Sequence, residues 1–256
     1  MTAFTQVQGA PCWIDLSSSD VDRSVDFYRE LLGWEATISG EEFGGYVMFT
    51  HDGESVAGLG AKMEGNEGPD TWATYLYSAD ARATAARIGE AGGANMFEPM
   101  EVPGMGTMGY AVDPTGAVIG IWQPDQHNGF EVHGTVGTAV WHELHTRNYP
   151  AAVDFYASAF GWKTQRLGND ESFRYSVLAA GEQELAGIFD ASFSLAEGVP
   201  SNWQVYFGVP DTDREVGRAL ELGGTIVEAP VDSRYGRMAA LTDATGAYFK
   251  IISVAV

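Results

Sequence analysis

The chain is poor in cysteine, and Cys12 is its only one among 256 residues. A single cysteine excludes an internal disulfide bond and a zinc cluster built on cysteines, and it fits a reducing compartment. Long apolar runs are also absent, since no stretch reaches the roughly 18 apolar residues of a membrane-spanning helix. The start, M-T-A-F-T-Q-V-Q-G-A, lacks the basic and then apolar layout of a signal peptide. We therefore expect a cytoplasmic protein that does not enter a membrane.

Basic residues are scarce as well. Lys and Arg total 14 against 35 Asp and Glu, which gives a formal net charge of -21. Such a surface repels a phosphate backbone, so the composition excludes nucleic acid as a partner. The acidic residues are spread along the chain, which is typical of a solvated surface and not of an acidic tail. A small organic molecule is the partner that we expect, bound by a monomer or a homodimer.

What the sequence does contain is an internal repeat. Residues 13–34 read W-I-D-L-S-S-S-D-V-D-R-S-V-D-F-Y-R-E-L-L-G-W, and residues 141–162 are a diverged copy. When 12–36 is aligned with 140–164, eight of 25 positions are identical. Each copy is typical of a strand that leads into an amphipathic helix closed by a glycine. The chain therefore has a duplicated organisation.

The duplication extends along the whole chain, because D-P-T-G-A at 113–117 is matched by D-A-T-G-A at 243–247. Between the halves, residues 124–134 are polar and contain glycine, which is typical of an exposed linker. We predict a first module at 1–123, a linker at 124–136 and a second module at 137–256.

Each half also looks doubled, with a strand, a helix and further strands occurring twice. This order predicts an α+β fold of four βαβββ units. The expected helices lie at about 21–32, 80–91, 151–159 and 211–222. The expected strands after the first lie near 46–50, 56–61, 72–77, 95–98, 108–112, 118–122, 139–144, 174–179, 185–189, 203–209, 225–229, 238–242 and 248–253.

Four βαβββ units, together with S-x-x-F-Y-x-x-x-L-G-W at 24–34 and D-P-x-G-A at 113–117, resemble the vicinal oxygen chelate superfamily. That superfamily includes glyoxalase I, bleomycin-resistance proteins, fosfomycin-resistance enzymes and extradiol ring-cleaving dioxygenases. The start P-C-W-I-D-L is most similar to two-module glyoxalase-like proteins of actinobacteria, which are often labelled hydroxylases or antigens. The resemblance implies that pairs of units curve into open barrels, each with a cup in its concave face.

The resemblance also implies where metal ligands would lie, at the start of a first strand and seven residues after the Asp of D-P-x-G. These positions hold Trp13 and Gly120 in the first half and Trp141 and Lys250 in the second. None of the four can ligate, and a Lys ammonium repels a cation. At the corresponding places in the other units only Gln204 could ligate. We therefore predict that the metal site is lost in both halves and that no cofactor is required.

A carboxylate accompanies each of these tryptophans. Side chains two apart on a strand share a face, so Asp15 should lie beside Trp13 and Glu143 beside Trp141. One interpretation is ligand recognition, in which the indole stacks on a flat or cationic molecule and the carboxylate binds an amine or hydroxyl. The other is that the tryptophan fills the vacated metal cavity and the acid accepts local hydrogen bonds. Both interpretations are consistent with the sequence.

The second half adds a histidine to this pattern. Glu143 and His145 share a face where the first half has Asp15 and Ser17. A carboxylate beside a histidine can orient it as a general acid or base, although such a pair can equally be structural. We expect His145 near the end of its strand, within reach of solvent. His142 should face the opposite way and pack under a helix.

Two longer loops occupy matching places, 101–107 and 231–237. The first offers Met105 as a candidate ligand contact. The second carries Arg234, Tyr235 and Arg237, which either bind an anionic group of a ligand or pair with surface carboxylates. His127 and His133 are expected to be linker residues.

Three functions remain open. The leading hypothesis is a metal-independent protein that binds an aromatic or carbonyl-bearing organic molecule in one or both cups. The alternative is an enzyme of glyoxalase, hydroxylase or lyase type, with a relocated site around Glu143 and His145 and with Gln204 as a further member. The third is an interaction or antigen-like protein with vestigial pockets. Whether each cup forms from consecutive units or from units exchanged between halves is also open.

Overall fold

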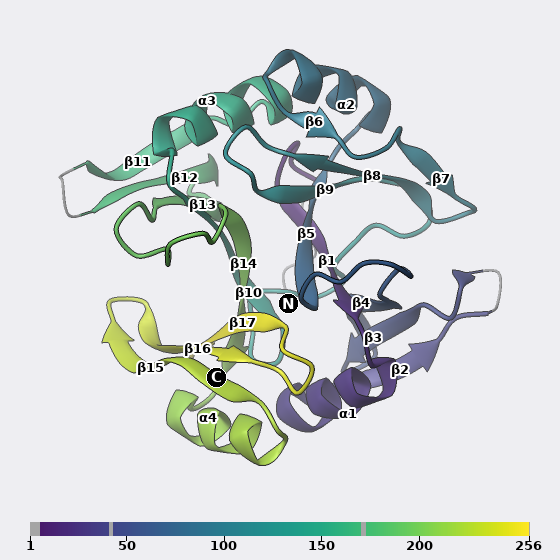
Figure 1. The fold of residues 1–256 in the computed structure, drawn as a ribbon, viewed down its shortest axis with the longest axis vertical. Coiled ribbons are helices and arrows are strands. Elements are labelled where there is room, and N and C mark those ends of the chain that lie inside the picture. The colour runs from purple at the N-terminus through teal and green to yellow at the C-terminus, as the bar shows by residue number, and fades with distance from the viewer. Residues whose placement is uncertain (1–5, 41–42, 170–172, 256) are drawn as a thin grey trace.

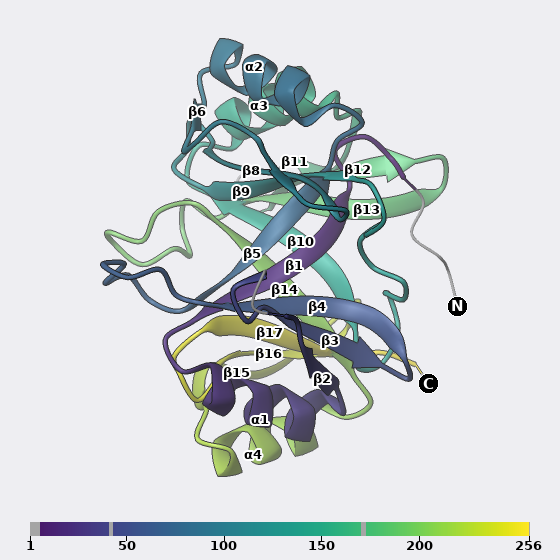
Figure 2. The ribbon, with the colours of Figure 1, turned by 90° about the vertical axis from the view of Figure 1, so that its right-hand side faces the viewer.

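The computed structural model describes residues 6–40, 43–169 and 173–255. Two curved sheets stand side by side, and paired helices cover the two ends of the molecule (Figure 1). The view from the side shows α1 next to α4 at one end and α2 next to α3 at the other (Figure 2). Every helix therefore lies against a helix of the other half.

Each half of the chain supplies one module. The first contains β1 (Pro11–Ser18), α1 (Val21–Leu32), β2 (Glu35–Ile38), β3 (Val47–His51), β4 (Glu54–Ala61), β5 (Thr71–Tyr77), α2 (Ala81–Glu90), β6 (Ala94–Asn95), β7 (Met100–Val102), β8 (Gly106–Val112) and β9 (Val118–Pro124).

The second module repeats this order after a connecting segment. It contains β10 (Ala139–Thr146), α3 (Tyr149–Phe160), β11 (Thr164–Asn169), β12 (Arg174–Ala180), β13 (Gln183–Asp190), β14 (Asn202–Val209), α4 (Thr212–Glu221), β15 (Thr225–Ser233), β16 (Gly236–Thr242) and β17 (Tyr248–Ser253).

The strand order shows how the cups are built. The first sheet runs β2-β3-β4-β1-β5-β9-β8-β6, with β7 paired to β8, and the second runs β11-β12-β13-β10-β14-β17-β16-β15. Each sheet thus uses two consecutive units, which answers the question that the sequence left open. In each sheet the first strand of the module pairs with the first strand of its second unit, β1 with β5 and β10 with β14. The predicted α+β fold of four βαβββ units in two modules is confirmed.

The repeated strand–helix stretch folds as its sequence predicts. The Asp20 side chain accepts a hydrogen bond from the Arg23 backbone N–H at 3.2 Å and begins α1. Gly33 ends the helix in the left-handed conformation, at φ 70°. In the second copy Asn148 and Gly161 do the same for α3. The predicted helix at 21–32 matches α1 in both of its ends.

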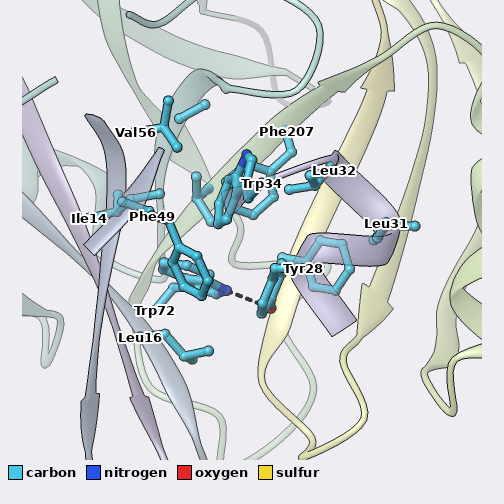
Figure 3. Close-up of a cluster of buried hydrophobic side chains, with 14 of the residues drawn as sticks. Ile14, Leu16, Tyr28, Leu31, Leu32, Trp34, Phe49, Val56, Trp72 and Phe207 are labelled. Carbon is cyan, nitrogen blue, oxygen red and sulfur yellow. Dashed lines mark hydrogen bonds between the residues drawn. The ribbon is translucent and has the colours of Figure 1, made fainter. Parts of the chain in front are cut away.

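The two modules share a hydrophobic core. Tyr28 of α1 is fully buried, and the Trp72 indole donates a 2.8 Å hydrogen bond to its hydroxyl. Phe207 of β14 packs against Trp34 in the same cluster, although it belongs to the second module (Figure 3). Because aromatic side chains from both halves interlock, the modules form one folded body.

Two expectations need correction. The segments 101–107 and 231–237 are mostly hairpin strand and not free loops, since β7 pairs with β8 and β15 with β16 over these residues. The polar segment 124–134 is not an exposed tether, because Phe130 within it is buried at 3% exposure. His142 contacts this segment, 5.8 Å from Phe130 between ring centroids, and its Nδ1 lies 3.4 Å from Thr74 Oγ1 of the first module.

Among the helices of the described residues, none has both the length and the apolar character needed to cross a membrane.

Candidate functional site

The first cup is organised around Asp15 on β1. The Trp13 indole donates to Asp15 Oδ1 at 2.9 Å, and the Tyr46 hydroxyl donates to the same oxygen at 2.5 Å. The Trp13 indole also donates to the Tyr46 hydroxyl oxygen, at 3.0 Å. Tyr75 on β5 lies opposite Trp13 in the sheet, and its hydroxyl is 2.5 Å from that of Tyr110. Trp13 and Asp15 therefore do share one face, as their spacing predicts.

A glycine makes this arrangement possible. Gly58 on β4 pairs with Asp15 in the parallel register of β1 and β4. A Cβ atom at position 58 would overlap the Tyr46 hydroxyl and Asp15 Oδ1. The absence of a side chain there lets the tyrosine reach the carboxylate across the neighbouring strand.

The concave face of the first module holds a cavity of about 330 Å³. Its wall is aromatic and sulfur-rich, with a small number of polar groups, and Trp13, Asp15 and Met105 take part in it as the sequence predicts. The wall is formed by Trp13, Asp15, Ser39, Phe43, Tyr46, Met48, Tyr75, Met100, Glu101, Val102, Pro103, Met105, Met108, Trp122 and His127. An apolar wall with few polar groups is the usual composition of a small-molecule site.

His127 closes one side of this cavity, although its sequence position indicated only a linker residue. Its ring stands edge-on to Trp13 at 4.4 Å between centroids. The backbone around it is fixed, because the His127 N–H donates to the Met105 carbonyl at 3.1 Å and the Trp122 indole donates to the His127 carbonyl at 2.9 Å. Burial lowers the pKa of His127 to about 4, against the opposing charge of Glu131. The imidazole is therefore neutral at neutral pH.

Asp15 has no ion-pair partner within the described part of the chain. Burial raises its pKa, and the hydrogen bonds from Tyr46, Tyr75 and Trp13 oppose that rise only in part. The carboxylate is thus held by neutral donors in an apolar setting.

The second cup repeats the arrangement with one addition. Glu143 on β10 accepts hydrogen bonds from Tyr175 at 2.5 Å and from Tyr206 at 2.8 Å, and Trp141 donates to Tyr175 at 3.0 Å. Its partner across the parallel pairing is Gly187, where a Cβ atom would overlap the Tyr175 hydroxyl. The pattern of tryptophan, acid, two tyrosines and a facing glycine therefore occurs twice.

The addition is His145, whose Nε2 lies 2.6 Å from Glu143 Oε1. Burial alone would raise the pKa of Glu143, but the hydrogen bond and charge of His145, with hydrogen bonds from Tyr175 and Tyr206, lower it to about 2. The expectation that solvent reaches His145 is wrong, since the residue is 7% exposed and packs on Phe189. Phe189 lies opposite His145 on the paired strand β13.

Acidification should therefore weaken the second cup. A carboxylate with a lowered folded-state pKa stabilises the fold above its unfolded pKa of 4.5, and this stability is lost as the pH falls through about 2. The shift corresponds to roughly 3 kcal/mol. We expect the difference in unfolding free energy between wild type and Glu143→Gln to shrink by about this amount between about pH 5 and pH 2, measured by urea denaturation.

Asp15→Asn is a control for which the opposite pH dependence of stability is expected. Because the folded-state pKa of Asp15 is raised, protonation relieves a burial cost, so wild type should gain stability relative to this variant as the pH falls. A gap for Glu143→Gln that stays constant over the same range would contradict the role given to the carboxylate.

The two cups differ at the position of Lys250. It pairs with Tyr206 in the parallel register of β14 and β17, where the first cup has Gly120 paired with Tyr75. Its ammonium stands 5.2 Å from the centre of the Tyr206 ring and 3.6 Å from Glu228. Gly120, by contrast, leaves room for the Tyr75 ring to lie against the strand.

The remaining predicted residues lie around the second cup. Gln204 accepts a 3.3 Å hydrogen bond from Tyr248 and donates to Asn202. Arg234 lies over the rings of Tyr235 and Phe173, at 4.6 and 5.9 Å.

Arg237 pairs with Asp213 and, at 3.0 Å, with Asp232. The guanidinium is thus engaged by surface carboxylates of its own module.

The donor set does not fit a divalent metal in either cup. A metal of this kind needs about three protein ligands. Trp13 and Gly120 offer none in the first cup. In the second, Trp141 and Lys250 offer none, and Glu143 already accepts hydrogen bonds from three residues. Across 6–40, 43–169 and 173–255, no three His, Cys, Asp or Glu side chains gather at metal-binding distances.

Comparison with known proteins agrees with this geometry. The model of the glyoxalase/bleomycin resistance protein/dioxygenase superfamily matches residues 12–121, and that of a glyoxalase-like domain matches 141–252. Anthracycline biosynthesis protein DnrV of Streptomyces peucetius is 37% identical over 268 residues, covering 99% of this chain and 96% of DnrV. The chain belongs to the glyoxalase/bleomycin resistance protein/dioxygenase superfamily.

Solved structures of this superfamily share the fold at low identity. The Mn(II)-bound glyoxalase from Novosphingobium aromaticivorans superposes with a TM-score of 0.65 at 19% identity, covering 97% of this chain and 83% of that one. The 2,3-dioxygenase LapB from Pseudomonas sp. KL28 gives 0.63 at 12% identity, covering 98% and 94%. The superfamily fold is thus retained by a chain in which the expected ligand positions carry Trp13, Gly120, Trp141 and Lys250.

Sequence reasoning missed the tyrosines and glycines of both cups. Tyr46 and Tyr175 are 129 residues apart, as are Gly58 and Gly187. An alignment of the two halves beyond the first helix would have paired them. Their recurrence at the same spacing in both halves is the sequence signal that could have identified these residues.

Proposed function

We propose that the protein binds a flat aromatic or carbonyl-bearing organic molecule in its first cup, without a metal. The observation that carries this proposal is the cavity of about 330 Å³ behind Trp13. Its volume falls within the range of about 300–1,000 Å³ usual for small-molecule sites. The second cup is not required for this function.

The wall favours a flat, polarisable ligand. Met48, Met100, Met105 and Met108 line the cavity together with Trp13 and Trp122. Thioethers adapt to irregular shapes and make favourable contacts with aromatic rings. Aromatic side chains stack on flat ligands and contribute energy beyond the buried area. The hydroxyl of Tyr46 and the Asp15 carboxylate would then set the ligand's orientation.

The name of one relative supports the same ligand class. DnrV is named for the biosynthesis of anthracyclines, which are flat aromatic compounds, and its match covers almost the whole chain. The glyoxalase and dioxygenase structures share only the fold with this chain, at 19% and 12% identity. They therefore carry no argument about the ligand.

An enzyme centred on the second cup is the alternative, favoured by the 2.6 Å contact of His145 with Glu143. That carboxylate also accepts from Tyr175 and Tyr206, so the pair is built into a satisfied network. A satisfied buried network stabilises a fold. We therefore prefer a structural role for this pair and place the ligand in the first cup.

Isothermal calorimetry with anthraquinone derivatives tests the proposal. Wild type should bind at least one of them saturably, and Trp13→Phe should weaken binding roughly fivefold to tenfold, because a large stacking surface and the indole donor are lost. Trp141→Phe is the matched control, since it makes the same change in the second cup, and it should leave the affinity within about threefold.

Two outcomes would contradict the proposal. One is the absence of saturable binding across the derivatives. The other is an equal loss of affinity in both tryptophan variants. Turnover of a probe that His145→Ala abolishes would instead favour the enzyme.

A further inference from the structure

We propose that the molecule bound in the first cup carries a positive charge, such as a protonated amine beside its flat ring system, which Asp15 and Glu101 recognise. This inference rests on the proposed function, because it specifies the ligand of the same cavity. Both carboxyl groups line that cavity, and neither has an ion-pair partner within the described residues.

The second cup provides the internal comparison. There the corresponding acid, Glu143, has a positively chargeable partner in His145 at 2.6 Å. The first module has Ser17 at the position of His145, two residues after Asp15 on the same face of β1. The first cup keeps the acid and lacks its partner. A cationic ligand would take the place beside Asp15 that the His145 ring takes beside Glu143 in the second cup.

No positive side chain of the described residues competes for this role. In the part of the chain that the structure describes, the residues that line the cavity include no Lys and no Arg. Its one imidazole, His127, is neutral at neutral pH because burial lowers its pKa. In the second cup, Lys250 stands over the Tyr206 ring, whereas the first cup has Gly120 at that position. An anionic ligand would therefore meet only negative charge in the first cup.

The aromatic wall favours a cation for a second reason. Trp13, Trp122 and Tyr75 line the cavity. Indole and phenol faces attract a positive charge through the ring quadrupole, and more strongly where water is excluded. Asp15 at the floor and Glu101 at the exposed rim would bind the amine, while the methionines contact the flat part of the ligand.

Three anthraquinones whose short side chains of similar size differ in charge test the inference. They carry an aminoethylamino, a hydroxyethylamino or a carboxymethylamino chain, so one is a cation, one is neutral and one is an anion at neutral pH. By calorimetry, wild type should bind the cation about tenfold more tightly than the neutral compound and the anion most weakly.

Substitutions assign this preference to the carboxyl groups. Asp15→Asn and Glu101→Gln should each reduce the ratio of cation to neutral affinity, and Ser17→His should reduce it as well by supplying an internal partner. Glu98→Gln is the matched control, because Glu98 is exposed and does not line the cavity. It should leave the ratio unchanged. Since Glu101 is exposed, its variant keeps the test valid even if Asp15→Asn folds poorly.

The outcomes separate the two proposals. If wild type binds none of the three compounds, the proposed function itself fails. If wild type binds all three equally well, or if the cation preference survives both Asp15→Asn and Glu101→Gln, the charge inference is overturned while the binding function stands.

Discussion

Replacing Gly58 by alanine is expected to destabilise the protein by roughly 3 kcal/mol and to abolish ligand binding in the first cup. A Cβ atom at this position would overlap the Tyr46 hydroxyl and Asp15 Oδ1. The tyrosine would have to leave the carboxylate, and Asp15 would lose a 2.5 Å hydrogen bond while remaining in an apolar setting. Urea denaturation measures the loss of stability, and calorimetry with the anthraquinones measures the loss of binding.

Gly60→Ala is the matched control, because Gly60 lies two residues further along β4 and nothing is found within 4 Å of a Cβ atom built there. This variant should change the unfolding free energy by no more than about 0.5 kcal/mol. A Gly58→Ala protein as stable as Gly60→Ala would show that Tyr46 can move away from Asp15 at little cost, and the network would then not be a determinant of the cup.

Asp243→Ala is expected to cost about 3–5 kcal/mol, since it removes a buried carboxylate from four donors at once. Asp243 Oδ1 accepts from the Thr245 N–H, the Thr245 hydroxyl and the Ala247 N–H, at 2.8, 2.9 and 2.9 Å. Oδ2 accepts from Tyr28 of the other module at 3.1 Å. Its loss therefore undoes both the turn before β17 and a contact between the modules.

Two further variants separate the contribution of the turn from that of the contact between the modules. Tyr28→Phe removes the contact between modules and the acceptor of the Trp72 indole, but it leaves the turn intact, so it should cost about 1–3 kcal/mol. Asp232→Ala removes a carboxylate that is exposed and pairs with Arg237, and it should cost less than about 0.5 kcal/mol. Thermal unfolding, followed by tryptophan fluorescence, ranks the three variants by their loss of stability. Equal losses for Asp243→Ala and Tyr28→Phe would show that the turn does not depend on the carboxylate.

Much of the fold could be predicted from the local sequence. The α1 helix has its capping Asp20, its apolar stripe and its terminal Gly33 within a single stretch, and both of its ends match the prediction. The repeat then transfers the same interpretation to α3. The face shared by Trp13 and Asp15 follows from the two-residue period of a strand and needs no knowledge of the rest of the chain.

The rest of the site depends on which strands become neighbours. Tyr46 reaches Asp15 only because β4, with Gly58, is paired to β1 in a parallel register. Single-strand periodicity contains no information about that register, which the pairing of distant segments sets. His127 was missed for a similar reason, since a polar segment that looks like a linker is fixed to Met105 by backbone hydrogen bonds.

The crossed contacts of Tyr28 with Asp243 and of Tyr156 with Asp113 have a consequence for the origin of the chain. Each module completes the last turn of the other and not its own. A single module before duplication could have formed these contacts only with a second copy of itself, so the present protein corresponds to a homodimer joined into one polypeptide. When the two modules are joined in one chain, they no longer have to meet by diffusion, because each is always present at a high local concentration near the other. It also allows the two copies to diverge, and a histidine could then arise beside one carboxylate while the other remained unpaired.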